Sequence, residues 1–539
     1  MSDRIELPEP SGPFSIGVID FELKDASREE EYAPGTNRRI PVRAWYPAAA
    51  TSGPTRPNAK PMELEHQVIP FLKMIPTETD ITALFDVPTH GHEDAPPLSG
   101  PKRPVLIFSH GGFASPHANT SLMEHLASHG YVLFSIGHPY VDSATLHENG
   151  DIITSDPSLF ADLMAKAADP AYLAAFVAPD PVERLEATLV NCAETKLAAQ
   201  FLVWEDDFIH VVDRLSKGDL PAKAMPLLDI IDIDRIGTFG MSFGCSGAAA
   251  AQRDERIKAA INLDGGLFDP DMIDRDSRVP MLIMHNDLAT LPGGKPHSEF
   301  SYEKLETAGT RPDIIRVEVK GATHLAFTDL CLTPPELRTD PVLAAAFGSI
   351  EGRRMAGIVH DFCKCFFDHV LGNEGSGLNP AFRANYPEVV DIDLTHVREW
   401  AATSPQPGFM SHRHVQIMNR LLADDTDSKA AAAKLPRVHV LAYQLANGPK
   451  GETVWWQMRF DPEEGLSFTL TEPDGPADLT MVGDWREAMQ DFIAIRDRKI
   501  DAAALRLKSV GDETFMTRTA EAFAAGMKAA TIPATIPEA

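Results

Sequence analysis

Runs of apolar residues recur along the first two thirds of the chain, separated by segments with helical periodicity. Eight such runs lie between residues 18 and 321: VIDFEL, IPVRAWYP, PVLIFSH, YVLFSIGH, RIGTFG, IKAAINLD, VPMLIMHND and DIIRVEVKG. Continuous apolar runs that alternate with helices are typical of parallel strands covered by helices on both faces. The pattern therefore predicts an α/β domain over residues 1–372 with a mostly parallel sheet.

A long segment interrupts this alternation between the fourth and fifth runs. Residues 145–205 have a helical pattern and are dense in Pro, Asp and Ala. Because they fall between two strands of one sheet, we expect them to form a helical cap over the sheet edge, where they would shape a pocket. A helical pattern over residues 353–371 then closes the domain.

The pattern changes again after Leu371. The stretch NEGSGLNP begins a polar, proline-bearing segment, and residues 373–405 are predicted to be a linker. Farther on, apolar and polar residues alternate with period two, and the apolar set is Trp456, Met458, Phe460, Leu466, Phe468, Leu470, Leu479 and Met481. Asp484 and Glu487 have the spacing of a capping box at a helix start. Residues 406–539 are therefore predicted to form a separate, small α+β domain.

Composition and charge narrow the classes of partner. The chain has 539 residues and a net charge of −29, so nucleic-acid backbones and anionic membrane surfaces would be repelled. No apolar run reaches membrane-spanning length, which argues against integral membrane association. The N-terminal MSDRIELPEP lacks a basic and apolar leader, so we expect a cytoplasmic protein. Five cysteines are too few, and odd in number, for a disulfide scaffold.

The stretch RIGTFGMSFGCSGAAAA contains the first candidate catalytic residue. Its G-x-S-x-G motif, centred on Ser242, is a weak signal alone because it arises by chance in about one chain of this length in six. A nucleophile elbow also needs a buried strand before the serine and a helix after it, and both patterns are present here. Ser242 is therefore the predicted nucleophile.

Acyl transfer by serine also requires a base and a carboxylate that orients it. In α/β-hydrolases these follow the serine in the order acid, histidine, each just past a strand. Asp264 and Asp287 each end a predicted strand after Ser242, and His324 follows the next one in the loop GATHLAF. The residue pattern predicts His324 as the base and leaves both carboxylates open.

The carbonyl oxygen of the ester becomes negatively charged when serine attacks. N–H groups that already point at this oxyanion must stabilise it. The strand PVLIFSH ends in His110-Gly111-Gly112-Phe113, where glycines let the backbone approach a ligand closely. We predict the N–H groups of Gly112 and of Phe243, the residue after the nucleophile, as donors. Further substrate-pocket candidates are Phe113, Met241 and His110.

The sequence also contains a competing metal motif. His90, His92 and Asp94 resemble the H-x-H-x-D-H ligand run of metallo-β-lactamase-like hydrolases, which activate water directly. Here the last histidine is replaced by Ala95, and the run lies in a proline-rich loop before a strand instead of after one. We therefore predict no metal and no other cofactor.

Several of these motifs share a resemblance. The stretches GPFSIGVIDFEL, IPVRAWYPAA, FSHGGFASPHANTSLMEHLASHGYVLFSIGHP, RIGTFGMSFG, INLDGGLF and GATHLAFTDL resemble the platelet-activating-factor acetylhydrolase family of α/β-hydrolases over residues 10–371. The resemblance implies an α/β-hydrolase fold, a short acyl group in the substrate, and Asp264 as the triad acid, whereas the generic hydrolase pattern favours Asp287. The family often has histidine where Met241 stands and glycine where Cys245 stands.

The C-terminal ADLTMVGDWREAMQDFIAIRDRKIDAAALRLKSVGD resembles the sterol carrier protein type 2 domain. The resemblance implies a small α+β fold with an apolar tunnel, although Ala504 replaces a usual glycine. Two interpretations remain open: the domain holds an apolar ligand or shields the hydrolase pocket, or it mediates contacts in a homodimer.

Together these patterns predict a serine carboxylic ester hydrolase acting through an acyl-enzyme on a small or lipid-like ester. The acyl group would be short and the alcohol part large and apolar. One alternative is a lactone or polyester-type hydrolase with the same triad. Another is a non-catalytic carrier of apolar ligands. The sequence leaves the physiological substrate and the oligomeric state open.

Overall fold

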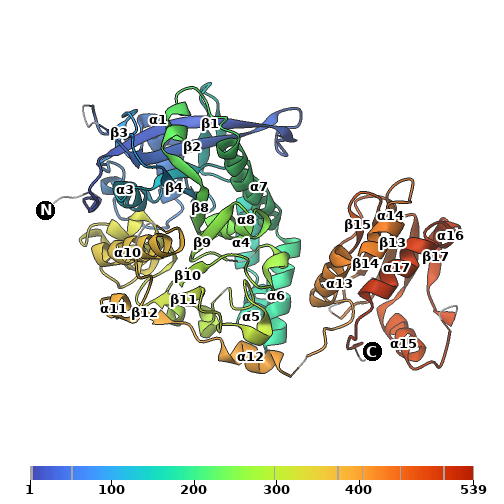
Figure 1. The fold of residues 1–539 in the computed structure, drawn as a ribbon. Coiled ribbons are helices and arrows are strands. Elements are labelled where there is room, and N and C mark those ends of the chain that lie inside the picture. Colours follow the sequence, from blue (N-terminus) through green and yellow to red (C-terminus); the bar gives the residue numbers. More distant parts are fainter. Residues whose placement is uncertain are drawn as a thin grey trace. The chain divides into compact units, whose positions relative to one another are not determined.

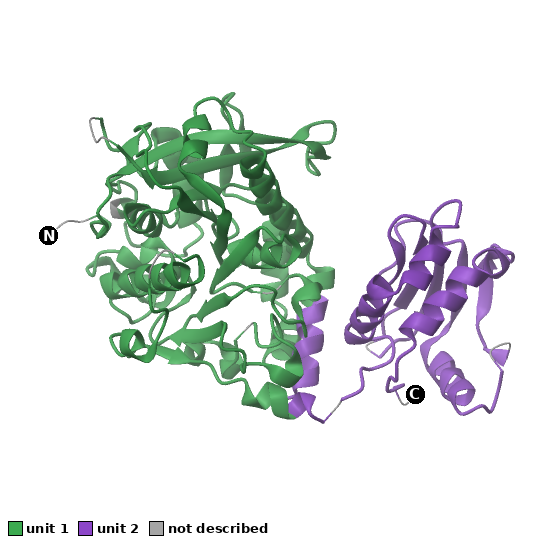
Figure 2. Cartoon of the chain, viewed as in Figure 1, with its two compact units in different colours: residues 1–179, 191–399 green, residues 180–190, 400–539 purple. Residues whose placement is uncertain are grey.

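The computed structural model describes residues 4–49, 53–266, 268–296, 298–372, 375–403, 405–449, 451–501 and 504–537. The chain divides into two compact units (Figure 1). The first comprises Met1–Pro179 and Asn191–Glu399, and the second comprises Asp180–Val190 and Trp400–Ala539 (Figure 2). Each contains its own cluster of buried apolar side chains.

A large mixed sheet forms the centre of the first unit. Its strand order in the described residues is β12-β11-β10-β9-β8-β4-β5-β2-β1-β3. The bounds are β1 (Ile16–Glu29), β2 (Asn37–Pro47), β3 (His92–Glu93), β4 (Arg103–Ser109), β5 (Val132–Ile136), β8 (Ile231–Met241), β9 (Ile257–Leu263), β10 (Met281–His285), β11 (Ile314–Val319) and β12 (Val389–Asp391). The six strands from β11 to β5 in this order are mutually parallel, whereas β2 pairs antiparallel with β5 and β1. The mostly parallel sheet predicted from the apolar runs is confirmed.

Helices cover both faces of this sheet (Figure 1). On one face α3 (Thr120–Ser128) packs against α10 (Gly352–Val370), and on the other α7 (Lys196–Ser216) packs against α8 (Ser246–Arg253). Short helices complete the unit: α1 (Pro61–Glu63), α2 (Ile69–Leu72), α9 (Pro341–Phe347), α11 (Pro380–Arg383) and α12 (Thr395–Ala401). This is the layered arrangement of an α/β fold.

The segment between β5 and β8 is largely helical. It contains the hairpin β6 (Ala144–Leu146) and β7 (Ile152–Thr154), followed by α4 (Pro157–Ala167), α5 (Pro170–Phe176), α6 (Pro181–Glu194) and α7. Its density in Asp and Pro has a local cause, because Asp156 and Asp169 cap α4 and α5 and a proline follows each cap at the first helical position.

The stretch predicted as a linker, residues 373–405, contributes to the large sheet. Its three-residue strand β12 pairs antiparallel with β11 and forms one edge of the sheet. A strand this short has no readable periodicity, so sequence analysis could not detect it. Residues 373, 374 and 404 lie outside the described part of the chain.

The second unit contains a smaller sheet, ordered β15-β14-β13-β16-β17 in the described residues. Its strands are β13 (His439–Ala446), β14 (Val454–Asp461), β15 (Gly465–Thr469), β16 (Leu479–Asp484) and β17 (Lys508–Gly511). Its helices are α13 (His412–Asp424), α14 (Thr426–Ala432), α15 (Trp485–Arg496), α16 (Phe515–Arg518) and α17 (Ala520–Ala530). Asp484 caps α15 by accepting the backbone N–H of Glu487. Strands and helices are thus mixed, as predicted, while the likeness to sterol carrier domains stays a prediction.

No helix within the described ranges has both the length and the apolar character needed to cross a lipid bilayer.

Candidate active site

Ser242 occupies a sharp turn between a buried strand and a helix. β8 ends at Met241, residues Ser242–Cys245 form a single 3-10 turn, and α8 follows at once. The φ of Ser242 is 55°, in the left-handed region that residues other than glycine rarely adopt. Such strain at the strand-to-helix junction is the geometry of a nucleophile elbow.

Close backbone approach explains the two glycines around Ser242. A Cβ atom on Gly240 would lie 1.9 Å from the carbonyl oxygen of Gly244, and one on Gly244 would lie 2.1 Å from the carbonyl oxygen of Ser109. Neither position has room for a side chain. The motif therefore reflects the packing of this turn.

A continuous hydrogen-bonded chain links Ser242, His324 and Asp264. His324 Nε2 lies 2.9 Å from Ser242 Oγ, and His324 Nδ1 lies 2.6 Å from Asp264 Oδ2. Asp264 directly follows β9, and His324 begins a turn after β11. The His324 side chain is 47% exposed and that of Asp264 only 4%. The histidine thus faces solvent while its partner carboxylate is enclosed.

Two further groups hold the Asp264 carboxylate. The backbone N–H of Asn286 donates to Asp264 Oδ1 at 2.8 Å, and His285 Nδ1 lies 3.8 Å from the same oxygen. Burial alone would raise the pKa of Asp264, but the neighbouring His285 ring and the hydrogen bond to His324 hold that pKa well below its usual range. Asp264 therefore stays ionised at neutral pH.

Sequence analysis did not single out His285. It is buried at the end of β10, and its Nε2 lies 2.8 Å from Ser298 Oγ. Its position at a strand tip, two residues before Asp287, was the available signal. Its contact with Asp264 depends on the pairing of β9 with β10, which the linear pattern does not reveal.

Asp287, the alternative acid, has other partners. Its carboxylate accepts hydrogen bonds from the backbone N–H of Gly321 at 2.9 Å and from Lys320 Nζ at 3.2 Å. It also caps the turn that begins at Leu288. The structure thus brings Asp264 to His324 and engages Asp287 elsewhere.

The glycine loop after β4 runs against the elbow. A Cβ atom on Gly111 would lie 3.2 Å from Ser242 Cβ, and one on Gly112 would lie 3.7 Å from Phe243 Cβ. The N–H of Phe113, whose φ is 62°, donates to the Val141 carbonyl. Gly112 and Phe243, the predicted donor pair, are therefore neighbours beside the serine.

The three pocket candidates are buried. Met241 is 2% exposed and Phe113 is 5% exposed, and the Phe113 ring packs edge-on against Phe160 of α4 at 5.4 Å. His110 is fully buried, with Nδ1 2.7 Å from the Gly111 carbonyl and Nε2 3.1 Å from Asp142 Oδ1. His110 thus contacts the glycine loop through the Gly111 carbonyl.

Helix α7 contributes aromatic side chains that sequence analysis missed. Trp204 packs edge-on against Phe243 at 4.7 Å and stacks on His138 at 3.7 Å. Phe201 also packs edge-on against Phe243, with ring centroids 5.3 Å apart. The spacing of Phe201, Trp204 and Phe208 on one helix face was the signal. These rings fix the residue that follows the serine.

The histidines of the competing metal motif point to other partners. His90 Nδ1 lies 2.8 Å from Glu124, and His92 Nδ1 lies 2.9 Å from the Gly53 carbonyl. Among the residues that the structure describes, no three His, Cys, Asp or Glu side chains are grouped to hold a metal ion.

Known proteins resemble this chain in sequence and fold. The family model "Platelet-activating factor acetylhydrolase, isoform II" matches residues 1–148. A probable 1-alkyl-2-acetylglycerophosphocholine esterase of Arthroderma benhamiae is 25% identical over 423 residues, covering 72% of this chain and 94% of that protein. The structure of a ferulic acid esterase from Streptomyces cinnamoneus superposes with a TM-score of 0.52 at 23% identity, covering 72% of this chain and 99% of the other. The first unit has an α/β-hydrolase fold, and the chain is a carboxylic ester hydrolase.

Proposed function

We propose that the chain hydrolyses esters through Ser242, His324 and Asp264. The observation that carries this proposal is the 2.9 Å contact of Ser242 Oγ with His324 Nε2, backed by the Asp264 carboxylate. His324 accepts the hydroxyl proton as Ser242 Oγ attacks the ester carbonyl. Ionised Asp264 holds the proton on Nδ1, so that Nε2 presents its lone pair to the serine, and it stabilises the imidazolium that forms.

The second half of the cycle uses the same groups. The N–H groups of Gly112 and Phe243 stabilise the oxyanion of each tetrahedral intermediate. When the first intermediate collapses, His324 returns its proton to the leaving alcohol and Ser242 keeps the acyl group. A water molecule, deprotonated by His324, then releases the acid and restores the serine.

We propose a short acyl group, with a larger apolar alcohol part, because the curated relative is named for an acetyl ester of an alkyl glycerophospholipid. The experiment is a series of nitrophenyl esters from acetate to octanoate, measured beside a small lactone. We expect kcat/KM to fall by at least about tenfold from acetate to octanoate. A pocket shaped for a short acyl chain discriminates against each extra methylene group by about 1 kcal/mol or more of transition-state binding. Equal rates across the series would contradict the short acyl pocket, and a preference for the lactone would favour the lactonase alternative.

We also propose that His285 acts as a positioning residue for Asp264. Replacing His285 by phenylalanine keeps a ring in the buried site but removes the ring nitrogen that lies 3.8 Å from Asp264 Oδ1. We expect kcat to fall by about tenfold with little change in KM, a loss of about 1.4 kcal/mol of transition-state stabilisation. His285→Gln retains an N–H donor and should recover part of that loss. Unchanged kcat in a folded His285→Phe protein would contradict the proposal that His285 positions Asp264.

For the second unit we propose an apolar ligand site beside Trp456. Rings of Phe409, Tyr443 and Phe468 surround this side chain, and its buried Nε1 has no hydrogen-bond partner in the described residues. In the full-length protein, Trp456→Phe should weaken binding of a fluorescent fatty acid about fivefold, because the indole donor is lost. Trp455→Phe, on the opposite face of β14, should not. No binding, together with a dimer in sedimentation, would assign this unit to self-association instead.

A further inference from the structure

The first unit contains a second set of linked serine, histidine and aspartate side chains, apart from the one at Ser242. Ser109 Oγ lies 2.9 Å from His138 Nε2, and His138 Nδ1 lies 2.8 Å from Asp207 Oδ2. All three residues are fully buried, whereas the His324 side chain is 47% exposed. A substrate ester cannot reach the serine of this buried triad, so the buried triad has a role other than nucleophilic attack.

The partners of Asp207 fix the proton positions in the buried triad. Arg38 of β2 and Arg28 of β1 each lie 2.7 Å from a different oxygen of the Asp207 carboxylate. Burial would raise the pKa of Asp207, but the charge of Arg38 and the hydrogen bond from His138 hold that pKa well below its usual range. The ionised carboxylate accepts the proton of His138 Nδ1, which leaves Nε2 to accept the hydroxyl proton of Ser109. Burial lowers the pKa of His138 to about 4, so its ring is neutral at physiological pH.

Ser109 connects the buried triad to the first oxyanion donor. It is the last residue of β4, where β5 and β8 flank it, and the glycine loop that contains Gly112 begins at the next residue. The Ser109 carbonyl also contacts the elbow, since a Cβ atom on Gly244 would lie 2.1 Å from it. The hydrogen bond to His138 therefore fixes the Ser109 side chain at the point where the glycine loop begins.

Helix α7 connects the buried triad to the second oxyanion donor. Trp204 and Asp207 are three residues apart on this helix and so share one face. The Trp204 ring stacks on the His138 ring, with centroids 3.7 Å apart and an interplanar angle of 8°, and packs edge-on against Phe243. The His138 ring thus contacts both Ser109, which precedes the glycine loop, and Trp204, which packs on Phe243.

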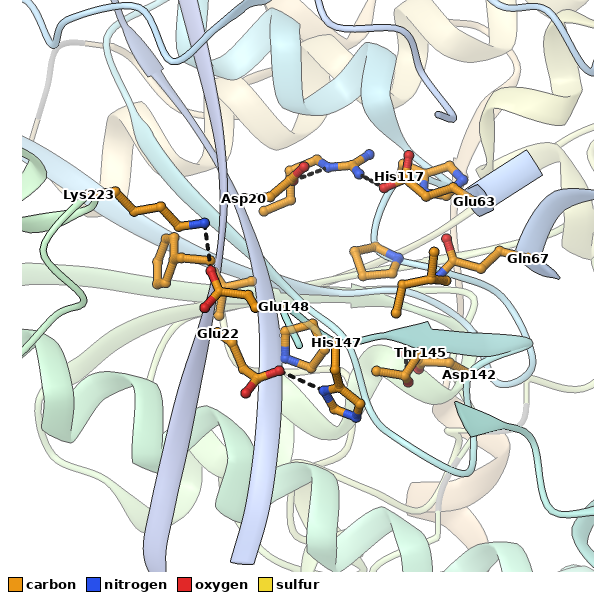
Figure 3. A pocket seen from close by; sticks show the side chains of 16 residues that line it. Asp20, Glu22, Glu63, Gln67, His117, Asp142, Thr145, His147, Glu148 and Lys223 are labelled. Atoms are coloured by element: carbon orange, nitrogen blue, oxygen red, sulfur yellow. Dashed lines mark hydrogen bonds and ion pairs between the residues drawn. The ribbon is translucent and has the colours of Figure 1, made fainter. Parts of the chain in front are cut away.

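The backbone of His138 is held as well as its ring. Its N–H donates to the Asp142 carboxylate at 2.8 Å, and Thr145 Oγ1 donates to the same carboxylate at 3.1 Å. Asp142 and Thr145 lie together in the lining of a hollow of about 200 Å³ against β1 and β2 (Figure 3). The same carboxylate lies 3.1 Å from His110 Nε2, at the start of the glycine loop. His138 therefore has a fixed orientation, which a residue that positions its neighbours requires.

We propose that His138, held by Asp207, is a positioning residue for both oxyanion donors, the N–H groups of Gly112 and Phe243. Such donors stabilise the transition state only when they lie within about 3 Å of the developing oxyanion, so a small displacement of either weakens transition-state binding. The buried ring does not touch the substrate, and substrate binding in the ground state should therefore change little. This inference rests on the proposed hydrolysis at Ser242.

The test compares His138→Phe with His360→Phe in the full-length protein. Phenylalanine retains a ring that can stack on Trp204 but removes both hydrogen bonds of the imidazole. His360 is the matched control, because it is also buried, burial also lowers its pKa to about 4, and its Nε2 lies 3.1 Å from Ser121 Oγ, between α10 and α3. The rate is expressed per active site, with the active fraction counted by fluorophosphonate labelling carried to completion.

In His138→Phe we expect kcat per active site for an acetate ester to fall by about tenfold or more, with KM changed by less than about twofold. A trifluoromethyl ketone gives a second readout: Ser242 adds to its carbonyl carbon, His324 takes the hydroxyl proton, and the resulting oxyanion occupies the same site. The affinity for this ketone should weaken by the same factor as kcat/KM. His360→Phe should keep kcat per active site and the ketone affinity within about twofold of the unaltered protein.

Ser109→Ala tests the connection to the glycine loop and is the milder variant. It removes the hydroxyl that donates to His138 and should lower kcat per active site and the ketone affinity by about threefold. In the His138→Phe background the same change should have no further effect, because the hydroxyl has already lost its partner. If His138→Phe does not fold, unchanged kcat and ketone affinity in a folded Ser109→Ala protein would overturn the inference.

Three outcomes of the main comparison would also overturn it: unchanged kcat per active site in folded His138→Phe, an equal loss in His360→Phe, or a rise in KM without a fall in kcat. An unaltered protein that neither labels at Ser242 nor hydrolyses the ester would overturn the proposed function, and this inference with it. Circular dichroism melts establish that each variant is folded.

Discussion

Ser242→Ala should lower kcat for ester hydrolysis by about 10⁶-fold while leaving the fold intact, because the reaction loses its only covalent acceptor. Alanine differs from serine here by the one oxygen that lies 2.9 Å from His324 Nε2. The measurement is steady-state hydrolysis of an acetate ester, with thermal melting as the check on folding.

A matched control lies four residues farther on. Ser246 is fully buried at the start of α8, and its Oγ has no hydrogen-bond partner in the described residues. Ser246→Ala therefore removes the same kind of atom from the first residue of the following helix without touching His324, and should keep kcat within about twofold of the unaltered protein. Retention of most activity by Ser242→Ala, or an equal loss in Ser246→Ala, would contradict the assignment of the nucleophile.

Asp264→Asn should lower kcat by about 10⁴-fold, because an amide can donate to His324 Nδ1 and so stabilise the wrong tautomer of the ring. The 2.6 Å contact between Asp264 Oδ2 and His324 Nδ1 would persist with the proton on the wrong partner. Asp287→Asn is the matched control, since asparagine can still accept the N–H of Gly321. We expect its kcat to change by less than about threefold. A large loss of kcat in Asp287→Asn, with kcat nearly unchanged in Asp264→Asn, would identify Asp287 as the triad acid instead.

The parts of the fold that the sequence predicted are those with strong local patterns. The buried parallel strands are continuous apolar runs, and the elbow is marked by Gly240 and Gly244, which the crowding of this turn requires. Because each parallel strand ends at the same edge of the sheet, chain order predicted His324 and one of two carboxylates near Ser242. The preference for Asp264 over Asp287 came from the family resemblance.

The features that sequence analysis missed depend on contacts between distant segments. His285 meets Asp264 only because β10 pairs with β9, and Trp204 meets Phe243 only because α7 packs on α8. In the second unit, β13 is a central strand paired on both sides, and its buried and half-buried positions do not alternate. Period-two alternation is the signal of strands with one solvated face, which explains why β14 and β15 were predicted and β13 was not.

The central claim is that Ser242 is a nucleophile activated by His324. Its most direct measurement is labelling of the full-length protein with a fluorophosphonate, followed by mass spectrometry of the digested protein. We predict one adduct, on Ser242, that forms much more slowly in His324→Ala and is absent from Ser242→Ala. An unlabelled Ser242 in a preparation that hydrolyses esters, or an adduct on another residue that abolishes activity, would contradict the account.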